Sequence, residues 1–504
     1  MTDSLASTLD DAVIRLRDGD HVGVARHDLS GPSEVPAGHK VALVDIPAGT
    51  HVRKYGEVIG VATQDIAAGS HVHVHNLAMV DLDHSGARVS VVPRVEPLPL
   101  DQQATFQGIV RPDGRIATRN YVGVLTTVNC SATTARRIAD QVSYSGVLDD
   151  FPHVDGVVAL THSTGCGMAA DGAGLDVLRR TISGYAEHPN FGALVVVGLG
   201  CEVNEIGRLT RDFELPDSVP VTPLTIQDLG GTRRTSDRGV GLVRDLLPDL
   251  DSVRREPVPA SKLVLGLNCG GSDGWSGVTA NPALGVAVDT LVRNGGTAVL
   301  GETPEVYGAE HLLTSRAVDA AVAERLMERI HWWERYTTDA GGSMDNNPSP
   351  GNKAGGLTTI LEKSLGAVAK GGSTPLAEVV EYAERVHGPG LVFMDTPGYD
   401  PVSVTGIVAG GANVVCFTTG RGSAFGAKPV PSIKLATNSD IYRRMDDDMD
   451  INCGVILDGD RTVDEVGAEV FETVLRVASG EHTRSEELGY GNEEFTPWQL
   501  GAVM

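Results

Sequence analysis

The sequence predicts an α/β protein in which a small β-rich module precedes a large region with mainly parallel sheets. Three observations lead to this fold class. A twenty-residue repeat with strand-like alternation lies near the N-terminus. Further along, short apolar runs rich in Val and Leu alternate with helical stretches, as buried parallel strands do. Glycine occurs at 61 of 504 positions, which indicates many tight turns and close approaches of the backbone.

Composition narrows the class of protein. There are 41 Lys and Arg against 66 Asp and Glu, a formal net charge of −25, and 41% of the residues are hydrophobic. The acidic balance argues against nucleic acid or a membrane surface as the main partner. We find no apolar run long enough to span a bilayer and no secretory signal. We therefore expect a cytoplasmic protein whose six cysteines are free thiols or metal ligands.

Residues 1–92 are expected to form the β-rich module. An apolar helical pattern around Leu9–Leu16 comes first, and the period then changes to two. The string Asp45–Val52 recurs as Asp65–Val72, which predicts two copies of a strand–turn–strand unit. Prolines concentrated in 93–105 then predict a stiff linker.

Residues 106–340 and 341–504 are expected to form the first and second parts of the α/β region. The segment 339–372 is rich in Gly, Asn and Pro and is predicted to be a long functional loop, with a disordered linker as the alternative. The pattern does not show whether residues 341–504 form a domain of their own or complete the sheet of residues 106–340. The predicted buried strands are Tyr121–Thr127, Val157–Leu160, Ala193–Leu199, Lys262–Leu267, Thr297–Leu300, Gly390–Met394 and Val414–Phe417.

Four cysteines lie at or just past the ends of predicted strands. They are Cys130, Cys166, Cys201 and Cys269. Because the carboxyl ends of parallel strands share one edge, residues far apart in the sequence can meet there. None forms a C-x-x-C pair, so a zinc ribbon fits poorly, whereas iron or an iron–sulfur cluster suits such thiolates. The alternative is that cysteine is simply a small residue that is often buried, and Cys416 and Cys453 are assigned to it.

Three histidines alternate with valines at His71, His73 and His75. On a strand they would share a face, and two imidazoles two residues apart can hold one metal ion. His73 and His75 are therefore secondary metal candidates, with an exposed polar face as an equally good explanation. Lys40 and Lys54 are candidates to bind a substrate carboxylate, and ordinary surface residues are the alternative.

Polar loops of the large region supply further groups for an anionic ligand. Arg119 precedes the first large strand and can clamp a carboxylate through two hydrogen bonds. Ser272 and Asp273 follow a later strand, before a helix predicted to begin with Asn281 as cap and Pro282 at its first position. Together with the loops below, they offer cations for an anion and hydroxyls for a polyol.

Two more loops carry Asn352 and Lys353, and Arg421, among small residues. Turn building alone also explains each of these loops. The string Gly270–Gly274 matches the G-x-S-x-G motif of serine hydrolases, but the predicted helix begins several residues too late for that function. The chain shows neither a P-loop nor a dinucleotide fingerprint.

Taken together, these strings resemble the altronate/galactarate dehydratase family over nearly the whole chain. The resemblance implies an N-terminal SAF module fused to a large α/β region, and iron-dependent removal of water from a hexonate or hexarate to give a 2-keto-3-deoxy acid. His73–Asn76 is similar to the altronate branch and Met449–Asn452 to the galactarate branch. The strings that carry it are Gly38–Leu43, Tyr55–Gly60, Gly198–Glu202, Cys269–Asp273, Thr279–Pro282, Asn347–Lys353 and Thr419–Gly422.

The resemblance implies a β-elimination. The metal, Fe2+ or an iron–sulfur cluster or another divalent ion, would bind the substrate, while a base removes the C2 proton and an acid protonates the 3-hydroxyl. His162 is the candidate base, with a structural buried histidine as the alternative, and Lys353 and Arg421 would contact substrate oxygens. The expected partner is a small anionic sugar acid, and a homodimer is compatible. A sulfolactate sulfo-lyase-like C–S lyase and a non-catalytic sugar-acid-binding protein are the alternative functions.

Overall fold

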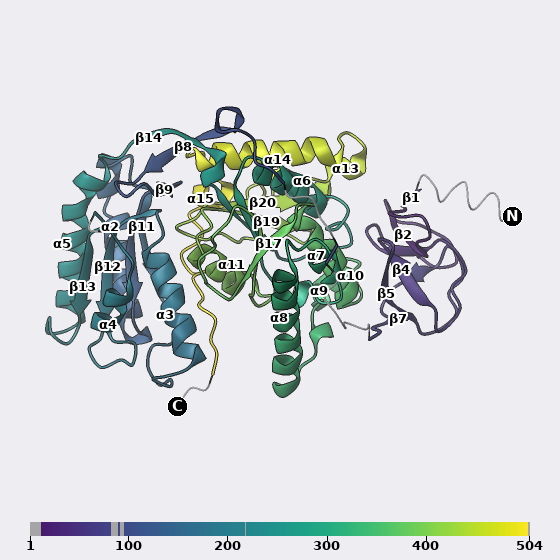
Figure 1. Ribbon diagram of the computed structural model, residues 1–504, viewed down its shortest axis with the longest axis horizontal. Coiled ribbons are helices and arrows are strands. Elements are labelled where there is room, and N and C mark those ends of the chain that lie inside the picture. Colours follow the sequence, from purple (N-terminus) through teal and green to yellow (C-terminus); the bar gives the residue numbers. More distant parts are fainter. Residues whose placement is uncertain (1–11, 82–88, 91–94, 217, 502–504) are drawn as a thin grey trace.

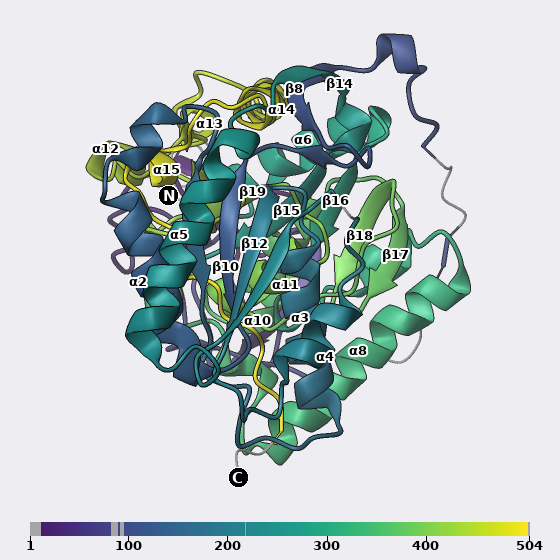
Figure 2. The ribbon, with the colours of Figure 1, turned by 90° about the vertical axis from the view of Figure 1, so that its left-hand side faces the viewer.

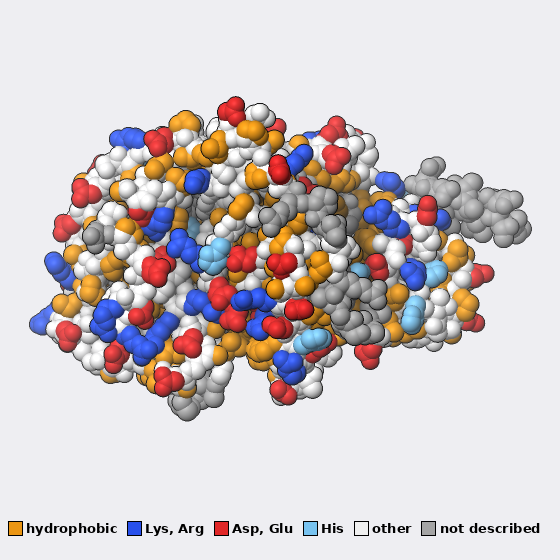
Figure 3. Space-filling view, in the orientation of Figure 1, with side chains coloured by type: hydrophobic (Ala, Val, Ile, Leu, Met, Phe, Trp, Pro, Cys, Tyr) orange, Lys and Arg blue, Asp and Glu red, His pale blue; other side chains and the backbone are white. Residues whose placement is uncertain are grey.

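The computed structural model describes residues 12–81, 89–90, 95–216 and 218–501. Three bodies lie in a row: the N-terminal β module, a central domain with a seven-stranded sheet, and a smaller α/β domain at the other end (Figure 1). The predicted fold class is confirmed. Acidic and basic side chains are interspersed over the face in Figure 3. Among the described residues, no helix combines the length and the apolarity needed to cross a membrane.

Two small antiparallel sheets form the N-terminal module. The repeat predicted there is real, since Ala48 N–H donates to Asp65 Oδ1 and Ala68 N–H donates to Asp45 Oδ1, both at 2.8 Å. Of the helical pattern predicted around Leu9–Leu16, residues 9–11 lie outside the described residues, Ala12 is helical, and Val13 and Ile14 form a strand. The sheets run β1 (Val13–Ile14), β2 (Val22–Ala25), β3 (Lys40–Ala42), β6 (His71–Val72), and β4 (His51–Lys54), β5 (Glu57–Ala62), β7 (Leu77–Ala78).

The second domain holds a four-stranded parallel sheet of order β11-β10-β12-β13. Its strands are β10 (Tyr121–Thr126), β11 (Gly156–Leu160), β12 (Phe191–Gly198) and β13 (Val221–Thr225). Two helices cover each face (Figure 2), namely α2 (Ala132–Ser143) with α5 (Thr232–Leu250), and α3 (Ala173–Ala186) with α4 (Ile206–Asp212). A small antiparallel sheet adjoins it, with β14 (Arg255–Pro259), β8 (Thr105–Val110) and β9 (Ile116–Ala117).

The central domain is built on a parallel sheet of order β17-β18-β16-β15-β19-β20-β21. Strands from both sides of residue 340 join in it, so the predicted division between 106–340 and 341–504 does not separate two domains. These strands are β15 (Val264–Cys269), β16 (Thr297–Leu300), β17 (Leu376–Val380), β18 (Gly390–Met394), β19 (Val414–Thr419), β20 (Ser432–Ala436) and β21 (Ile451–Asn452).

Helices of the central domain pack on this sheet and line its edge. The segment 339–372, predicted to be a loop, contains two of them, and every residue of α10 is buried. Helix α6 begins one residue before Asn281, which lies inside it. The helices are α6 (Ala280–Arg293), α7 (His311–Thr314), α8 (Ala320–Asp339), α9 (Pro350–Ala354), α10 (Ile360–Val368), α11 (Asp400–Ala409), α12 (Ser439–Arg444), α13 (Val455–Asp458), α14 (Val463–Ala478) and α15 (Arg484–Glu487).

Candidate functional site

The strand order of the seven-stranded sheet places a crevice beside β15. From β15 the chain builds outward on one side through β16, and it later returns to add β19 on the other side. Ligands of open α/β sheets bind outside the carboxyl ends of strands at such a switch point. The loops that leave the two strands touch there, since the N–H groups of Gly420 and Arg421 donate to Gly271 O at 3.1 and 2.9 Å.

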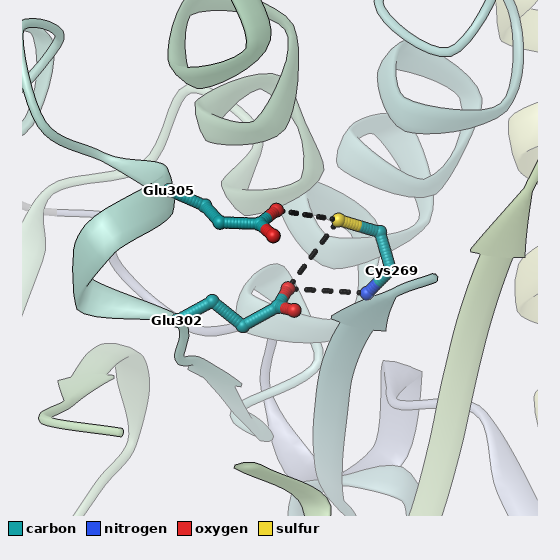
Figure 4. Close-up of side chains that lie close together, drawn as sticks. All are labelled: Cys269, Glu302 and Glu305. Carbon is teal, nitrogen blue, oxygen red and sulfur yellow. Dashed lines mark hydrogen bonds between the residues drawn. The ribbon is translucent and has the colours of Figure 1, made fainter. Parts of the chain in front are cut away.

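A thiol and two carboxylates meet at this edge (Figure 4). Cys269 ends β15, and Glu302 and Glu305 follow β16. The Cys269 Sγ donates to Glu305 Oε2 at 3.1 Å and to Glu302 Oε2 at 3.4 Å. All three residues are buried, and their ligand atoms lie within 4.8 Å of one another. They form a candidate metal site.

Two lysines balance the charges of this cluster. Lys370 Nζ donates to Glu302 Oε2 at 2.8 Å, and Lys363 Nζ donates to Glu305 Oε1 at 2.7 Å. Burial, reinforced by the two glutamates, raises the pKa of the Cys269 thiol well above its ordinary value. The sulfur therefore keeps its proton at neutral pH unless a cation replaces it.

Glu302 adopts an unfavourable backbone conformation for a residue with a side chain, at φ +67°. Such strain costs roughly 1–3 kcal/mol and tends to occur at functional sites. Thr396 holds this turn, since its Oγ1 accepts from the Glu302 N–H at 2.6 Å. Glu302 Oε1 is buried and makes no hydrogen bond within the described residues.

These side chains fit a divalent ion in donor type. One sulfur and two carboxylates suit a cation of intermediate softness such as Fe2+, and the unpartnered Glu302 Oε1 offers a further oxygen. An ion would take the place of the Cys269 proton and weaken the contacts to Lys363 and Lys370, because like charges repel.

A cavity of about 260 Å³ opens beside Cys269. Glu305, Lys363 and Asp400 line it. Burial, and then the charges of the two neighbouring glutamates, raise the pKa of Asp400 to about 7. A carboxyl group with that pKa gives up or takes a proton near neutral pH, as a general acid must.

Four histidine rings of the N-terminal module gather next to the C-terminal end of α9. They are His39, His71, His73 and His75, and neighbouring ring centroids lie 5.1 to 5.5 Å apart. The strand predicted over His71–His75 ends at Val72, and a turn follows in which Asn76 Oδ1 accepts from the His73 N–H at 2.9 Å. His75 is exposed.

Hydrogen bonds fix which histidine nitrogens carry hydrogen. His73 Nε2 donates to Lys353 O at 2.9 Å and His39 Nε2 to Ala354 O at 3.3 Å, since a carbonyl only accepts. His39 Nδ1 lies 3.0 Å from His71 Nε2 and therefore accepts from it. Burial lowers the pKa of His71 and of His73 to about 4, so both rings are neutral. The Nδ1 atoms of these two rings are left as basic nitrogens.

Lys40 and Lys54 were predicted to bind substrate, and the structure contradicts this. Both are buried, and their Nζ atoms each lie 2.8 Å from Glu362 of α10. Lys40 Nζ also donates to Gly356 O at 2.6 Å. Their charges attach the module to the central domain instead of facing a ligand.

Asp273, Ser272 and Asn352 were also expected to bind substrate, but they hold loops together. Asp273 accepts from the Trp275 N–H and from the hydroxyls of Ser276 and Thr437. Asn352 Nδ2 donates to Ser272 O at 2.8 Å, and its Oδ1 accepts from the Ser349 N–H at 3.0 Å. Ser272 is buried.

Arg119 was predicted to bind substrate, and the structure places its guanidinium against partners within the chain. The five N–H donors of Arg119 are all used, at Glu486, Thr118, Val477 and Glu481, because the guanidinium is buried and must be satisfied within the chain.

The predicted base His162 sits in the second domain, outside the site at β15. Its ring nitrogens lie 3.0 Å from Thr126 O and 3.1 Å from Thr164 Oγ1. Burial lowers its pKa to about 4. The prediction that His162 is the catalytic base is therefore not supported by its position.

The four strand-end cysteines do not converge. Cys130, Cys166 and Cys201 belong to the four-stranded sheet and are exposed, whereas Cys269 belongs to the seven-stranded sheet and is buried. Strand ends share an edge only within one sheet, and the sequence pattern did not show that there are two.

Lys353 and Arg421 remain available for a ligand. Lys353 is half-buried on α9 and Arg421 is exposed. Within the described residues, neither ammonium nor guanidinium group makes a hydrogen bond or an ion pair. Arg421 lies along the loops of Gly271 and Gly355, where a Cβ built at either glycine would be 3.2 Å from its side chain.

Sequence reasoning missed Glu302, Glu305, Asp400 and His39, and it named His71 only as a member of the histidine row. Glu302 and Glu305 were detectable, because acidic residues just past the predicted strand Thr297–Leu300 occupy the same edge as Cys269. His39 and His71 become neighbours only through the pairing of β3 with β6.

Three family models match the chain. They describe the altronate/galactarate dehydratase SAF domain at residues 5–80, the second domain of D-galactarate dehydratase/altronate hydrolase at 108–251, and the C-terminal domain of D-galactarate/altronate dehydratase at 260–503. The last boundary agrees with the start of the seven-stranded sheet.

Curated relatives match over similar lengths. Galactarate dehydratase (L-threo-forming) of Escherichia coli is 39% identical over 95% of each chain. Altronate dehydratase of the same organism is 36% identical over 94% of each chain. The beta subunit of (2R)-sulfolactate sulfo-lyase from Chromohalobacter salexigens is 33% identical over 77% of this chain and 95% of its own.

Proposed function

We propose, from the premise that the chain belongs to the altronate/galactarate dehydratase family, that it is a hydro-lyase acting on a galactarate- or altronate-type sugar acid. The product would be a 2-keto-3-deoxy acid. One observation carries this proposal: the histidines of the SAF module contact the last two residues of α9, Lys353 and Ala354, beside the switch point of the central sheet. Neither the SAF module nor the central domain alone carries both the histidines and the groups at the switch point.

The basic nitrogens of this histidine group suit removal of the C2 proton. His73 Nδ1 is our preferred base, because the bond from its Nε2 to Lys353 O fixes both the ring and the tautomer. In the free protein its pKa is lowered to about 4. A bound dicarboxylate would bring negative charge close to the ring and raise that pKa toward neutral pH, which strengthens the base when substrate is present.

Lys353 and Arg421 would bind the substrate carboxylates and hydroxyls. Their charges are uncompensated within the described residues, and they flank the same loops as the histidines. A guanidinium presents two parallel N–H groups to a carboxylate, and a nearby ammonium adds a second positive charge. Together they would hold an anionic substrate although the chain as a whole carries a net charge of −25.

Asp400 is our candidate for the acid that protonates the departing 3-hydroxyl. It lines the cavity beside Cys269, and in the metal-free protein burial raises its pKa to about 7, which favours a protonated carboxyl group. Cys269, Glu302 and Glu305 would hold a metal ion, for which we propose iron. When bound, such an ion supplies Lewis-acid stabilisation of the negative charge that develops at the substrate.

Turnover by protein purified without oxygen tests the proposal. The protein is mixed with galactarate, altronate or sulfolactate, and 2-keto acid and sulfite are assayed. Formation of 2-keto acid from galactarate or altronate is expected. Sulfite from sulfolactate, without keto acid from either hexose-derived acid, would replace the proposal with a sulfo-lyase. Binding of these acids without turnover would favour a binding protein.

Loss of the metal is measured separately. Cys269→Ser should lower both the iron content per chain and the dehydration rate, because a hydroxyl is a much poorer ligand than a thiolate for this ion. Cys453→Ala, at a buried cysteine far along the chain, is the matched control and should keep both. Full iron content in Cys269→Ser would place the metal elsewhere.

A further inference from the structure

Three exposed cysteines lie at one edge of the four-stranded sheet, outside the site proposed for dehydration. Cys130 follows β10, Cys166 follows β11 and Cys201 follows β12. The other cysteines of the chain are buried. Cysteine is among the residues most often buried, so three exposed thiols on neighbouring loops call for a reason.

Hydrogen bonds tie the three loops to one another. The Asn129 N–H donates to Thr164 O at 3.0 Å, and the Asn204 N–H donates to Gly165 O at 3.1 Å. Asn204 Nδ2 also donates to Thr127 O at 3.1 Å. Each loop that carries a cysteine is therefore fixed against another, within one to three residues of the thiol.

The topology of this sheet makes the same edge a second ligand crevice. From β10 the chain adds β11 on one side and then returns to add β12 on the other, in the order β11-β10-β12-β13. The switch point lies between β10 and β12, where open α/β sheets bind their ligands. Glu202 shapes that crevice by accepting from the N–H groups of Gly200 and Cys201 at 2.7 and 2.9 Å.

The spacing of the thiols indicates the class of ligand. Thiolates prefer soft metals, and three sulfurs around one tetrahedral zinc ion, with Zn–S of about 2.3 Å, would lie roughly 3.8 Å apart. In the part of the chain that the structure describes, only Cys269, Glu302 and Glu305 bring three such donor atoms within 4.8 Å of one another. The three exposed sulfurs are thus spread too widely for one ion, whereas a cluster of several atoms bridges wider separations.

We infer that Cys130, Cys166 and Cys201 are the ligands of one iron–sulfur cluster at the switch point of the second domain. They bind as thiolates and release their protons. This site is separate from the one built on Cys269, and the two are tested by different readouts.

The experiment uses the full chain, purified without oxygen and reconstituted with ferrous iron and sulfide. Iron, zinc and acid-labile sulfide per chain are measured, together with the visible charge-transfer absorption. The wild type is expected to hold labile sulfide and to be coloured. Cys130→Ser, Cys166→Ser or Cys201→Ser should each remove most of the sulfide and the colour, while the thermal midpoint stays near that of the wild type, because exposed substitutions change stability little.

Matched controls and contrary outcomes separate this inference from the proposed function. Ser163→Ala, on the same loop as Cys166, and Cys416→Ala should keep the cluster. A wild type without labile sulfide overturns the inference, even if it dehydrates galactarate. Zinc bound in place of iron, or a triple cysteine variant that retains the colour, overturns it too. A cluster without any dehydration would leave the inference standing and count against the proposed function.

Discussion

Replacing Glu362 by glutamine should loosen the N-terminal module where it contacts α10. The change removes the charge that Lys40 and Lys54 share and nearly keeps the size of the side chain. The side chains of both lysines are at most 1% exposed, and each lies 2.8 Å from the carboxylate. Removing one partner from a buried ion pair costs roughly 3–5 kcal/mol, because the remaining charge is left without compensation.

The pKa of Glu362 gives a similar magnitude. Burial raises this pKa, but the charges and hydrogen bonds of Lys40 and Lys54 outweigh burial and lower it from 4.5 to about 2. A gap of about 2.5 units, at about 1.4 kcal/mol per unit, corresponds to about 3.5 kcal/mol. Because the folded-state pKa is depressed, this stability is present above about pH 4.5 and is lost as the pH falls toward 2.

Hydrogen exchange of the full chain at neutral pH measures the effect locally. Peptides that contain β3 and β4 should exchange about two orders of magnitude faster in Glu362→Gln, the ratio equivalent to about 3 kcal/mol. Glu469→Gln is the matched control, since Glu469 pairs with Arg461 on the surface and should matter little. Exchange in β3 and β4 within a factor of two of the wild type would refute the reasoning.

Three further variants test other parts of the site. His73→Ala should lower kcat by roughly 10²–10⁴-fold with an unchanged urea midpoint, as expected for a base; full activity would exclude this role. The wild-type kcat should fall with rising pH as the Asp400 carboxyl loses its proton, and Asp400→Asn should be slow and lack that fall; an identical profile would assign it to another group. Arg119→Leu should lower the free energy of unfolding by roughly 3–5 kcal/mol, because Glu486 loses its buried partner; calorimetry showing an unchanged midpoint would contradict this.

The sequence predicted the structure best where residues of one kind follow one another along a strand, and where a whole string of residues is repeated. Apolar runs such as Tyr121–Thr127 and Gly390–Met394 are buried strands in the structure. A strand that is covered on both faces is apolar along its length, so its sequence is easy to recognise. The repeated strings of the module also predicted their structure well, because each copy carries the aspartate that caps a turn of the other.

Side-chain roles were harder to predict, because they depend on which elements pack together. Lys40, Lys54 and Arg119 have the chemistry to bind a carboxylate, and each does so, but the carboxylate belongs to Glu362 or Glu486 of the same chain. A local pattern shows that a cation is present and cannot show the distant partner that will neutralise it. Lys353 and Arg421 differ only in that no such partner lies near them within the described residues.

The buried charges at Glu362 have a role that depends on the module being fused to the central domain. A tethered module meets its docking surface at an effective concentration of the order of mM, so a contact with a dissociation constant of roughly 10 μM would keep it docked about 99% of the time. The module therefore stays docked without a large contribution from buried charges, whose desolvation costs free energy. What they restrict is register, because Lys40 and Lys54 can both reach the two oxygens of one carboxylate in a single arrangement.

Register in turn decides where the His73 ring lies. His73 and Lys40 both bond to the segment 353–356, at the C-terminal end of α9, so a small slip of the module would move the base from the substrate while the module stays attached. Displacements of that kind cost catalysis far more than they cost binding. We therefore expect Glu362→Gln to reduce kcat by a larger factor than the factor by which His73→Ala changes the docking equilibrium of the module. We also expect the triple change Lys40→Met, Lys54→Met, Glu362→Leu to recover stability without recovering kcat. Equal recovery of both, measured by urea unfolding and by keto-acid formation, would show that the charges serve stability alone.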